Sequence, residues 1–206
     1  MPNWCNNNLT LQHEDPAMIK RAAEALDRGE FLQEFIPVPE DLKITAGFLG
    51  DGDAQKALEA QTKANVEKYG YGNWYDYSVG EWGTKWDVGD DGATDVHPDG
   101  KMLHTYFDSA WSPPVAAYEK LTELGFTVGA MYYEGGMSYA GVWEDGVDDY
   151  YDLGGMNSTQ VAEELPVELD EAFGISESMA EYEAENEEEL TAWIKDGADK
   201  TKLVAL

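Results

Sequence analysis

The chain has 206 residues, of which 43% are hydrophobic and 12% aromatic, a composition that suits one domain with an appendage. Its 42 Asp and Glu outnumber 13 Lys and Arg, so the formal net charge at pH 7 is −29. Contacts between cations and phosphates supply most nucleic-acid affinity, and anionic membranes attract the same cations. The charge therefore argues against direct nucleic-acid or membrane binding and favours partner proteins with a basic surface. The alternative is that it only keeps the chain soluble.

Targeting, metal and cofactor signals are absent from the sequence. No apolar run approaches the ~20 residues that cross a bilayer, and the start of the chain lacks the regions of a signal peptide, so we expect a cytoplasmic protein. The single cysteine, Cys5, lies in an alternating segment, which favours a buried apolar role over a reactive thiolate. His13, His97 and His104 lack metal-ligand spacing, and the common nucleotide-binding and nucleophile motifs do not occur. We therefore predict no metal, no cofactor and no enzymatic activity.

The first element of the chain is predicted to be a strand, followed by a helix. Residues 5–12 alternate between the two faces expected of a half-buried strand. Asp15 and Pro16 form a helix start, apolar residues follow at helical spacing, and Gly29 ends the helix.

The next segment, about 31–80, is predicted to be an insertion. Pro37 and Pro39 cannot lie in the centre of a sheet, because each removes a ladder donor. Asp53 begins a predicted helix. Residues 69–77 are rich in Tyr, Gly and Asn, a composition typical of contact loops, although a lid packed over the sheet would also fit.

The second half of the domain is predicted to hold three strands, a helix and a hairpin. Residues 81–87 form a short strand, an acidic glycine-rich loop comes next, and 101–108 form the next strand. Ser112 begins a helix, 126–132 alternate as a strand, and 140–143 return as a hairpin. The buried positions of this helix are expected to be Ala117, Tyr118, Leu121 and Leu124. The order βαββαβ predicts an α+β fold, a ferredoxin-like sandwich over residues 1–150.

The remaining residues, 151–206, are predicted to be an acidic helical extension. Residues 157–160 have the form of a capping box, and 178–181 have the same form at the start of a helix that should end at Gly197. Its apolar stripe is Met179, Tyr182, Leu190 and Trp193, which could dock on the core.

Several strings of the first 145 residues resemble the YubB-like proteins of phages and conjugative plasmids. These strings are residues 1–10 (MPNWCNNNLT), 82–87 (WGTKWD), 107–114 (FDSAWSPP), 132–134 (YYE) and 136–137 (GM). The resemblance implies a ferredoxin-like domain and a mobile-element protein in a host cell, but no reaction. The acidic extension lies outside it.

Two groups of side chains are candidate binding sites. The first is a tryptophan–lysine patch of the predicted sheet, in which aromatic rings supply contact energy and a lysine orients an anionic group. Its proposed members are Trp82, Lys85, Trp86, Asp108, Trp111 and Tyr133. The alternative is that these tryptophans form the core. The acidic loop 87–95 is a poor match to a calcium-binding loop, because Gly89 and Pro98 occupy ligand positions.

The second candidate is an acidic face on the C-terminal helix, made of Glu181, Glu185, Glu188 and Glu189. Carboxylates four residues apart lie about 6 Å apart along a helix, a spacing that could imitate successive phosphates. The alternative is an ordinary solvated face.

Three functions are compatible with these candidates. The first is a non-enzymatic phage or plasmid accessory protein that binds a host protein, as an acidic mimic of nucleic acid. The alternative is a small-ligand or peptide-binding module that uses the tryptophan–lysine patch, and the third is an enzyme of unknown type.

Overall fold

The computed structural model describes residues 3–90, 92–144 and 146–203, and in the last helix it describes the side chains up to residue 188 and that of Trp193. The chain forms two compact units, Met1–Tyr150 and Tyr151–Leu206. Helices and strands both contribute to the fold, so the predicted α+β class is confirmed.

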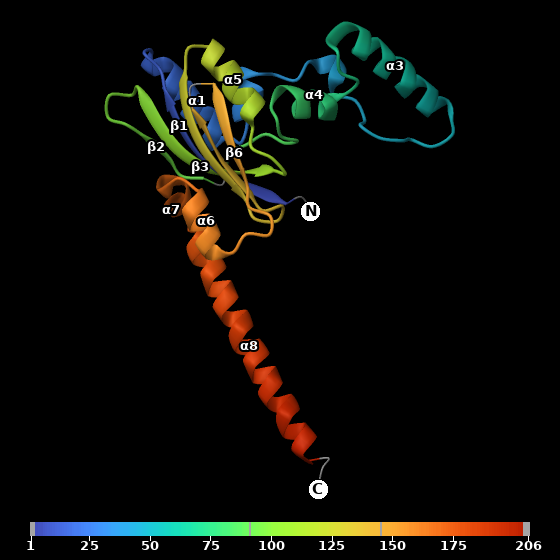
Figure 1. The fold of residues 1–206 in the computed structure, drawn as a ribbon. Coiled ribbons are helices and arrows are strands. Elements are labelled where there is room, and N and C mark those ends of the chain that lie inside the picture. Colours follow the sequence, from blue (N-terminus) through green and yellow to red (C-terminus); the bar gives the residue numbers. More distant parts are fainter. Residues whose placement is uncertain (1–2, 91, 145, 204–206) are drawn as a thin grey trace. The chain divides into compact units, whose positions relative to one another are not determined.

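A six-stranded sheet, in the order β2-β3-β1-β4-β5-β6, organises the first unit (Figure 1). Its strands are β1 (Trp4–Gln12), β2 (Thr94–Val96), β3 (Met102–Ala110), β4 (Thr127–Glu134), β5 (Tyr139–Glu144) and β6 (Val147–Asp152). The β1 strand pairs antiparallel with both β3 and β4, so the first strand of the chain is central in the sheet. The pairs β2–β3 and β4–β5 are antiparallel as well.

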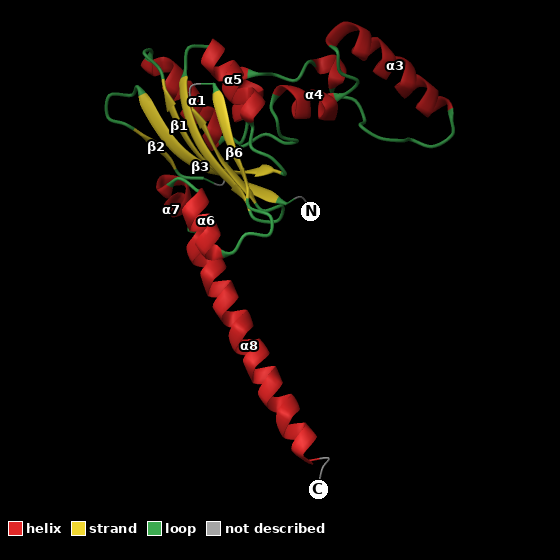
Figure 2. Cartoon of the chain, in the orientation of Figure 1, coloured by secondary structure: helices red, strands yellow, loops and turns green. Residues whose placement is uncertain are grey.

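The helices of the first unit lie on one side of the sheet and beyond its edge (Figure 2). They are α1 (Pro16–Asp27), α2 (Phe31–Phe35), the 3₁₀ turn η1 (Glu40–Leu42), α3 (Asp53–Tyr69), α4 (Trp74–Glu81) and α5 (Val115–Glu123). The start of α1 is as predicted, since the Asp15 side chain accepts a hydrogen bond from the Ala17 N–H and Pro16 is the first helical residue.

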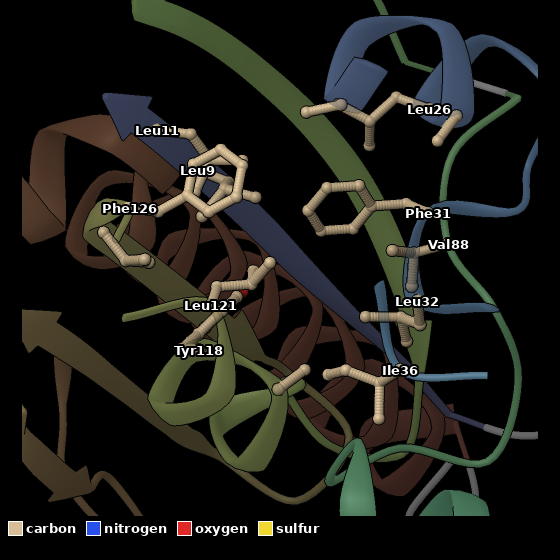
Figure 3. Close-up of a cluster of buried hydrophobic side chains, with 14 of the residues drawn as sticks. Leu9, Leu11, Leu26, Phe31, Leu32, Ile36, Val88, Tyr118, Leu121 and Phe126 are labelled. Atoms are coloured by element: carbon tan, nitrogen blue, oxygen red, sulfur yellow. The ribbon is translucent and has the colours of Figure 1, made fainter. Parts of the chain in front are cut away.

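The core lies between α1, α5 and the sheet face that carries Leu9, Ala130 and Trp143. These residues are paired across β1, β4 and β5, so their side chains share one face. Apolar residues of the predicted insertion join this core, as Figure 3 shows for Phe31 and Ile36. The insertion is therefore part of the packed domain.

One predicted strand and one predicted helix cap of the second half are wrong. Residues 81–87 are not a strand, because α4 extends to Glu81 and the chain then turns at Gly83, which has a φ of +87°. A side chain at Gly83 would also come within 3.1 Å of Pro113 O, so the close approach of the chain requires glycine. The edge strand is instead β2, within the predicted acidic loop. Ser112 does not cap α5, since its hydroxyl donates to Gly83 O at 2.5 Å.

The second unit contains α6 (Ser158–Glu164), α7 (Val167–Phe173) and α8 (Ile175–Leu203). The predicted capping box at Asn157 and Gln160 is confirmed. The predicted start at Ser178 and end at Gly197 are wrong, because α8 begins at Ile175 and continues past that glycine. Helix α6 is joined to α8 by Ser158, whose N–H and hydroxyl donate to Glu183 at 2.8 and 2.7 Å.

Of the predicted buried positions of α5, Ala117, Tyr118 and Leu121 are confirmed, whereas Leu124 is 46% exposed at the end of the helix. Within the described ranges, none of the helices has the length and apolar content of a membrane span.

Candidate binding site

A turn after α4 carries two residues of the predicted patch, Lys85 and Trp86, and hydrogen bonds fix this turn to the core. The Trp82 indole N–H donates to Ile36 O at 2.9 Å, and the Thr84 hydroxyl donates to Ala110 O at 3.0 Å. The backbone that leads into Lys85 is therefore held against buried partners.

Asp87 closes the turn by capping α2. Its carboxylate accepts hydrogen bonds from the N–H groups of Leu32 (2.6 Å), Gln33 (2.9 Å) and Val88 (2.9 Å). Burial raises the pKa of this carboxyl above its ordinary value, although the three N–H groups oppose that shift. Asp87 is thus a structural carboxylate that points at backbone donors.

The ammonium of Lys85 lies over three aromatic rings. Its Nζ is 4.7 Å from the centroid of the Trp86 ring, 4.9 Å from that of Trp111 and 5.7 Å from that of Tyr75. The Trp4 ring extends the group, with its centroid 5.9 Å from that of Trp86. We call these five side chains the tryptophan–lysine cluster. The rings attract the ammonium because their faces are electron-rich.

The Tyr75 ring of the cluster comes from α4, whose first turn is capped by the Asn73 side chain through the N–H groups of Tyr75 and Asp76. The predicted loop over 69–77 is therefore partly helical. Glu81, at the end of α4, forms an ion pair with Lys120 of α5, which ties this helix to the domain.

Trp111 adopts a backbone conformation that is rare outside glycine, with a φ of +68°. Its N–H donates to Asn3 O at 2.9 Å, and its carbonyl accepts a hydrogen bond from the Tyr139 hydroxyl at 2.7 Å. A non-glycine residue in this region costs roughly 1–2 kcal/mol, and such strain is common at functional sites. The indole of this residue lies beside Lys85.

The electrostatics of the cluster are unusual for so acidic a chain. In the part of the chain that the structure describes, no carboxylate lies within ion-pair distance of the Lys85 ammonium, whereas Lys43, Lys68 and Lys101 all form ion pairs. The rings remain accessible: Trp4, Trp86 and Trp111 are 46, 39 and 44% exposed. The cluster therefore combines three exposed indoles with a cation that has no carboxylate partner among the described residues.

A hollow of about 400 Å³ adjoins the cluster. Lys85 and Trp86 form part of its wall, and Trp74 and Trp82 contribute further rings. Ser78 also lines the hollow, and its fully buried hydroxyl has no hydrogen-bond partner in the described structure. The volume falls within the range of small-molecule sites.

The structure unites only part of the predicted patch. Lys85, Trp86 and Trp111 come together, but Trp82 is buried, as the alternative core role predicted. Asp108 and Tyr133 lie opposite Asn6 on the two strands beside β1, and Asp108 accepts a hydrogen bond from the Asn6 side chain at 2.7 Å.

Sequence reasoning missed Trp4 and Tyr75 as members of the cluster. Trp4 begins the central strand β1, so its place at the end of that strand was the available signal. Tyr75 gave no such signal, because its helix was predicted as a loop.

The predicted acidic face is solvent-exposed in α8 as far as the structure describes it. Glu181, Glu185 and Glu188 are all exposed. The side chain of Glu189 lies outside the described residues. Tyr182 and Trp193 are 68 and 74% exposed, so these two members of the apolar stripe are open to solvent. Among the described residues, no group of three or more His, Cys, Asp or Glu is arranged to hold a metal ion.

The scan against protein-family models gives no match, and neither does the search of curated proteins. Among solved structures, the chain is similar to the crystal structure of the protein api92 from Yersinia pseudotuberculosis, of family DUF1281. The two share 12% identity, the match covers 75% of this chain and 99% of that chain, and the TM-score is 0.38. A similarity this distant supports neither a fold nor a function, and the resemblance to the YubB-like family stays a prediction.

Proposed function

We propose that this protein is a non-enzymatic binding module that recognises its partner through the tryptophan–lysine cluster. The observation that carries the proposal is the Lys85 ammonium, held over three aromatic rings and without a carboxylate partner among the described residues. A binding module needs an exposed contact surface of this kind, and it does not need an activated nucleophile.

The energetics of the cluster favour a contact surface over a purely structural role. The exposed indoles leave apolar surface in contact with water. A partner that covers this surface gains roughly 25 cal/mol of free energy for each Å² buried. Tryptophan and tyrosine are enriched among the residues that dominate binding energy.

The test is capture of a partner from host lysate by the full-length protein and by two matched variants. Trp86→Ala removes a ring of the cluster, whereas Trp193→Ala removes an exposed tryptophan of α8. We expect one partner to be retained by the wild type and by Trp193→Ala but reduced at least about tenfold by Trp86→Ala. Equal capture by Trp86→Ala would overturn the proposal.

The acidic face of α8 is a second candidate, and the exposure of Glu181, Glu185 and Glu188 favours it. Its partner would be a host protein with a basic surface that normally receives nucleic acid. Binding of this kind weakens steeply with salt, since exposed charges are screened beyond about 10 Å at 0.1 M ionic strength. Replacing the three glutamates with glutamine should then abolish capture; unchanged capture would exclude this candidate.

We also propose the ferredoxin-like fold and the phage or plasmid origin that the sequence predicts. The order β2-β3-β1-β4, with α1 and α5 as the helices that come after β1 and β3, supports a ferredoxin-like layout extended by β5 and β6. The resemblance to mobile-element proteins supports a phage or plasmid accessory protein that acts in the host cytoplasm. Expression of the chain in a host, with subsequent fractionation, tests that location.

A further inference from the structure

We propose that the hollow beside the cluster binds a planar group that carries a carboxylate, with the ring against Trp86 and Trp74 and the carboxylate on Lys85. This inference rests on the proposed binding function and adds the chemistry of the ligand. It depends on three features of the wall: its charges, its rings and one hydroxyl.

Lys85 is the charged side chain of the wall that is available to a ligand. The other charged side chains of its wall are engaged: Lys43 is 2.9 Å from Glu40, Glu30 is 3.2 Å from Arg28, and Asp87 accepts three backbone hydrogen bonds. Lys85 has aromatic faces near its ammonium and no carboxylate of the described chain. A carboxylate would supply the anionic hydrogen-bond acceptor that is missing.

The rings of the hollow select a flat apolar group. Trp86 and Trp82 come from the turn, and Trp74 comes from the start of α4. Trp82 is buried and its indole N–H is committed to Ile36 O, so this residue forms the floor of the wall and offers no donor. Stacked or edge-on aromatic contacts of this kind favour a planar partner.

Ser78 provides the independent sign of a ligand. Ser78 lies in the wall of the hollow, and its fully buried hydroxyl lacks a hydrogen-bond partner within the described chain. Buried hydroxyls are nearly always paired, because an unpaired one loses its hydrogen bonds to water without compensation. A ligand with a polar atom beside its ring would satisfy it.

The experiment is a titration of the ¹⁵N-labelled full-length chain with N-acetyltryptophan, which carries a carboxylate, and with N-acetyltryptophanamide, its neutral counterpart. We expect the acid to bind at least about tenfold more tightly than the amide, since a charge-assisted hydrogen bond is lost in the amide. The indole N–H signals of Trp74 and Trp86 should shift, and that of Trp193 should not.

Variants test whether the preference for the acid over the amide arises in the hollow. Lys85→Met should remove the preference for the acid, whereas Lys20→Met, which changes the net charge equally on the exposed face of α1, should keep it. Ser78→Ala should weaken binding several-fold without lowering the melting temperature, because the hydroxyl is unpaired in the free protein. Equal affinity for acid and amide, or an unchanged preference in Lys85→Met, would overturn the inference.

A second pair of probes distinguishes a free small acid from the end of a protein chain. A short peptide that ends in tryptophan, with a free or an amidated C-terminus, should bind more tightly than N-acetyltryptophan if the natural ligand is a chain terminus. Equal affinity of peptide and amino acid would assign a small acid.

The outcome also separates the inference from the proposed function. If no carboxylate ligand binds but capture of a partner still depends on Trp86, the inference fails and the proposed function stands. If the acid binds and capture is independent of Trp86, the proposed partner recognition fails.

Discussion

The contrast between Trp82 and Trp86 gives a quantitative test of how the turn is built. Trp82 is 4% exposed and donates a hydrogen bond to Ile36 O, whereas Trp86 is 39% exposed and contacts Lys85 and Trp4. Removing a buried tryptophan costs about 3–5 kcal/mol, a large share of the roughly 5–15 kcal/mol that stabilises a domain. Removing Trp86 forfeits a cation–π contact and an aromatic pair, which together are worth about 1–2 kcal/mol.

The free energy of unfolding falls by roughly 1–3 kcal/mol for each M of urea. We therefore expect Trp82→Ala to lower the urea midpoint of the first unit by about 2 M. Trp86→Ala should lower it by less than half as much. Labelling of the Cys5 thiol during a urea series is the suitable assay, because Cys5 is fully buried in β1 and reports on this unit alone. Equal effects of the two variants would refute the assignment of Trp82 to the core and Trp86 to the surface.

Three further predictions concern single residues. Burial raises the pKa of the Cys5 thiol to about 12, so we expect a disulfide reagent to modify it only after urea unfolds the protein; rapid modification of the native protein would contradict this. Trp111→Gly should be more stable than Trp111→Ala by about 1 kcal/mol in thermal melts, because glycine accepts the positive φ; the reverse order would show that the backbone is unstrained. A hydrogen bond from Arg21 holds the pKa of the Glu34 carboxyl below its ordinary 4.5. The ionised Glu34 therefore contributes fully to stability above pH 4.5, and this contribution is lost as the pH falls through the lowered pKa. The melting temperature of Glu34→Gln should therefore fall short of the wild type at pH 7 and approach it near pH 2, and a constant difference would contradict the reasoning.

The elements predicted well from sequence are those whose local signals agree with their packing. The strand β1 has an alternating pattern that matches the buried face of the sheet, and α1 begins at a capping aspartate next to a proline. In both cases the local preference and the tertiary contact favour the same conformation.

Elements whose form depends on distant contacts were predicted poorly. The segment after α4 is rich in aromatic residues, yet the bond from Trp82 to Ile36 O and the close approach of Gly83 to Pro113 make it a turn. The strands β2 and β6 are short or acidic and lack a strand pattern of their own; they are ordered by pairing with neighbours.

The same contrast between local signals and distant contacts applies to the candidate site. Lys85, Trp86 and Trp111 were predicted together because the strands expected to carry them would pair in the sheet; residues 81–87 form a turn instead, and this turn brings them together. The contribution of Tyr75 depends on the cap of α4, and the hollow depends on how α4 packs against the turn. Neither is encoded in the spacing of the residues that form it.

We propose that recognition takes place at the tryptophan–lysine cluster and not on the acidic face of α8. The most direct test is the affinity of the captured partner for two variants of the full-length protein, Trp86→Ala and the triple replacement of Glu181, Glu185 and Glu188 by glutamine. We expect at least about tenfold weaker binding by Trp86→Ala and an affinity within about twofold of the wild type for the triple variant at about 0.15 M salt. Full affinity in Trp86→Ala with loss in the triple variant would contradict it.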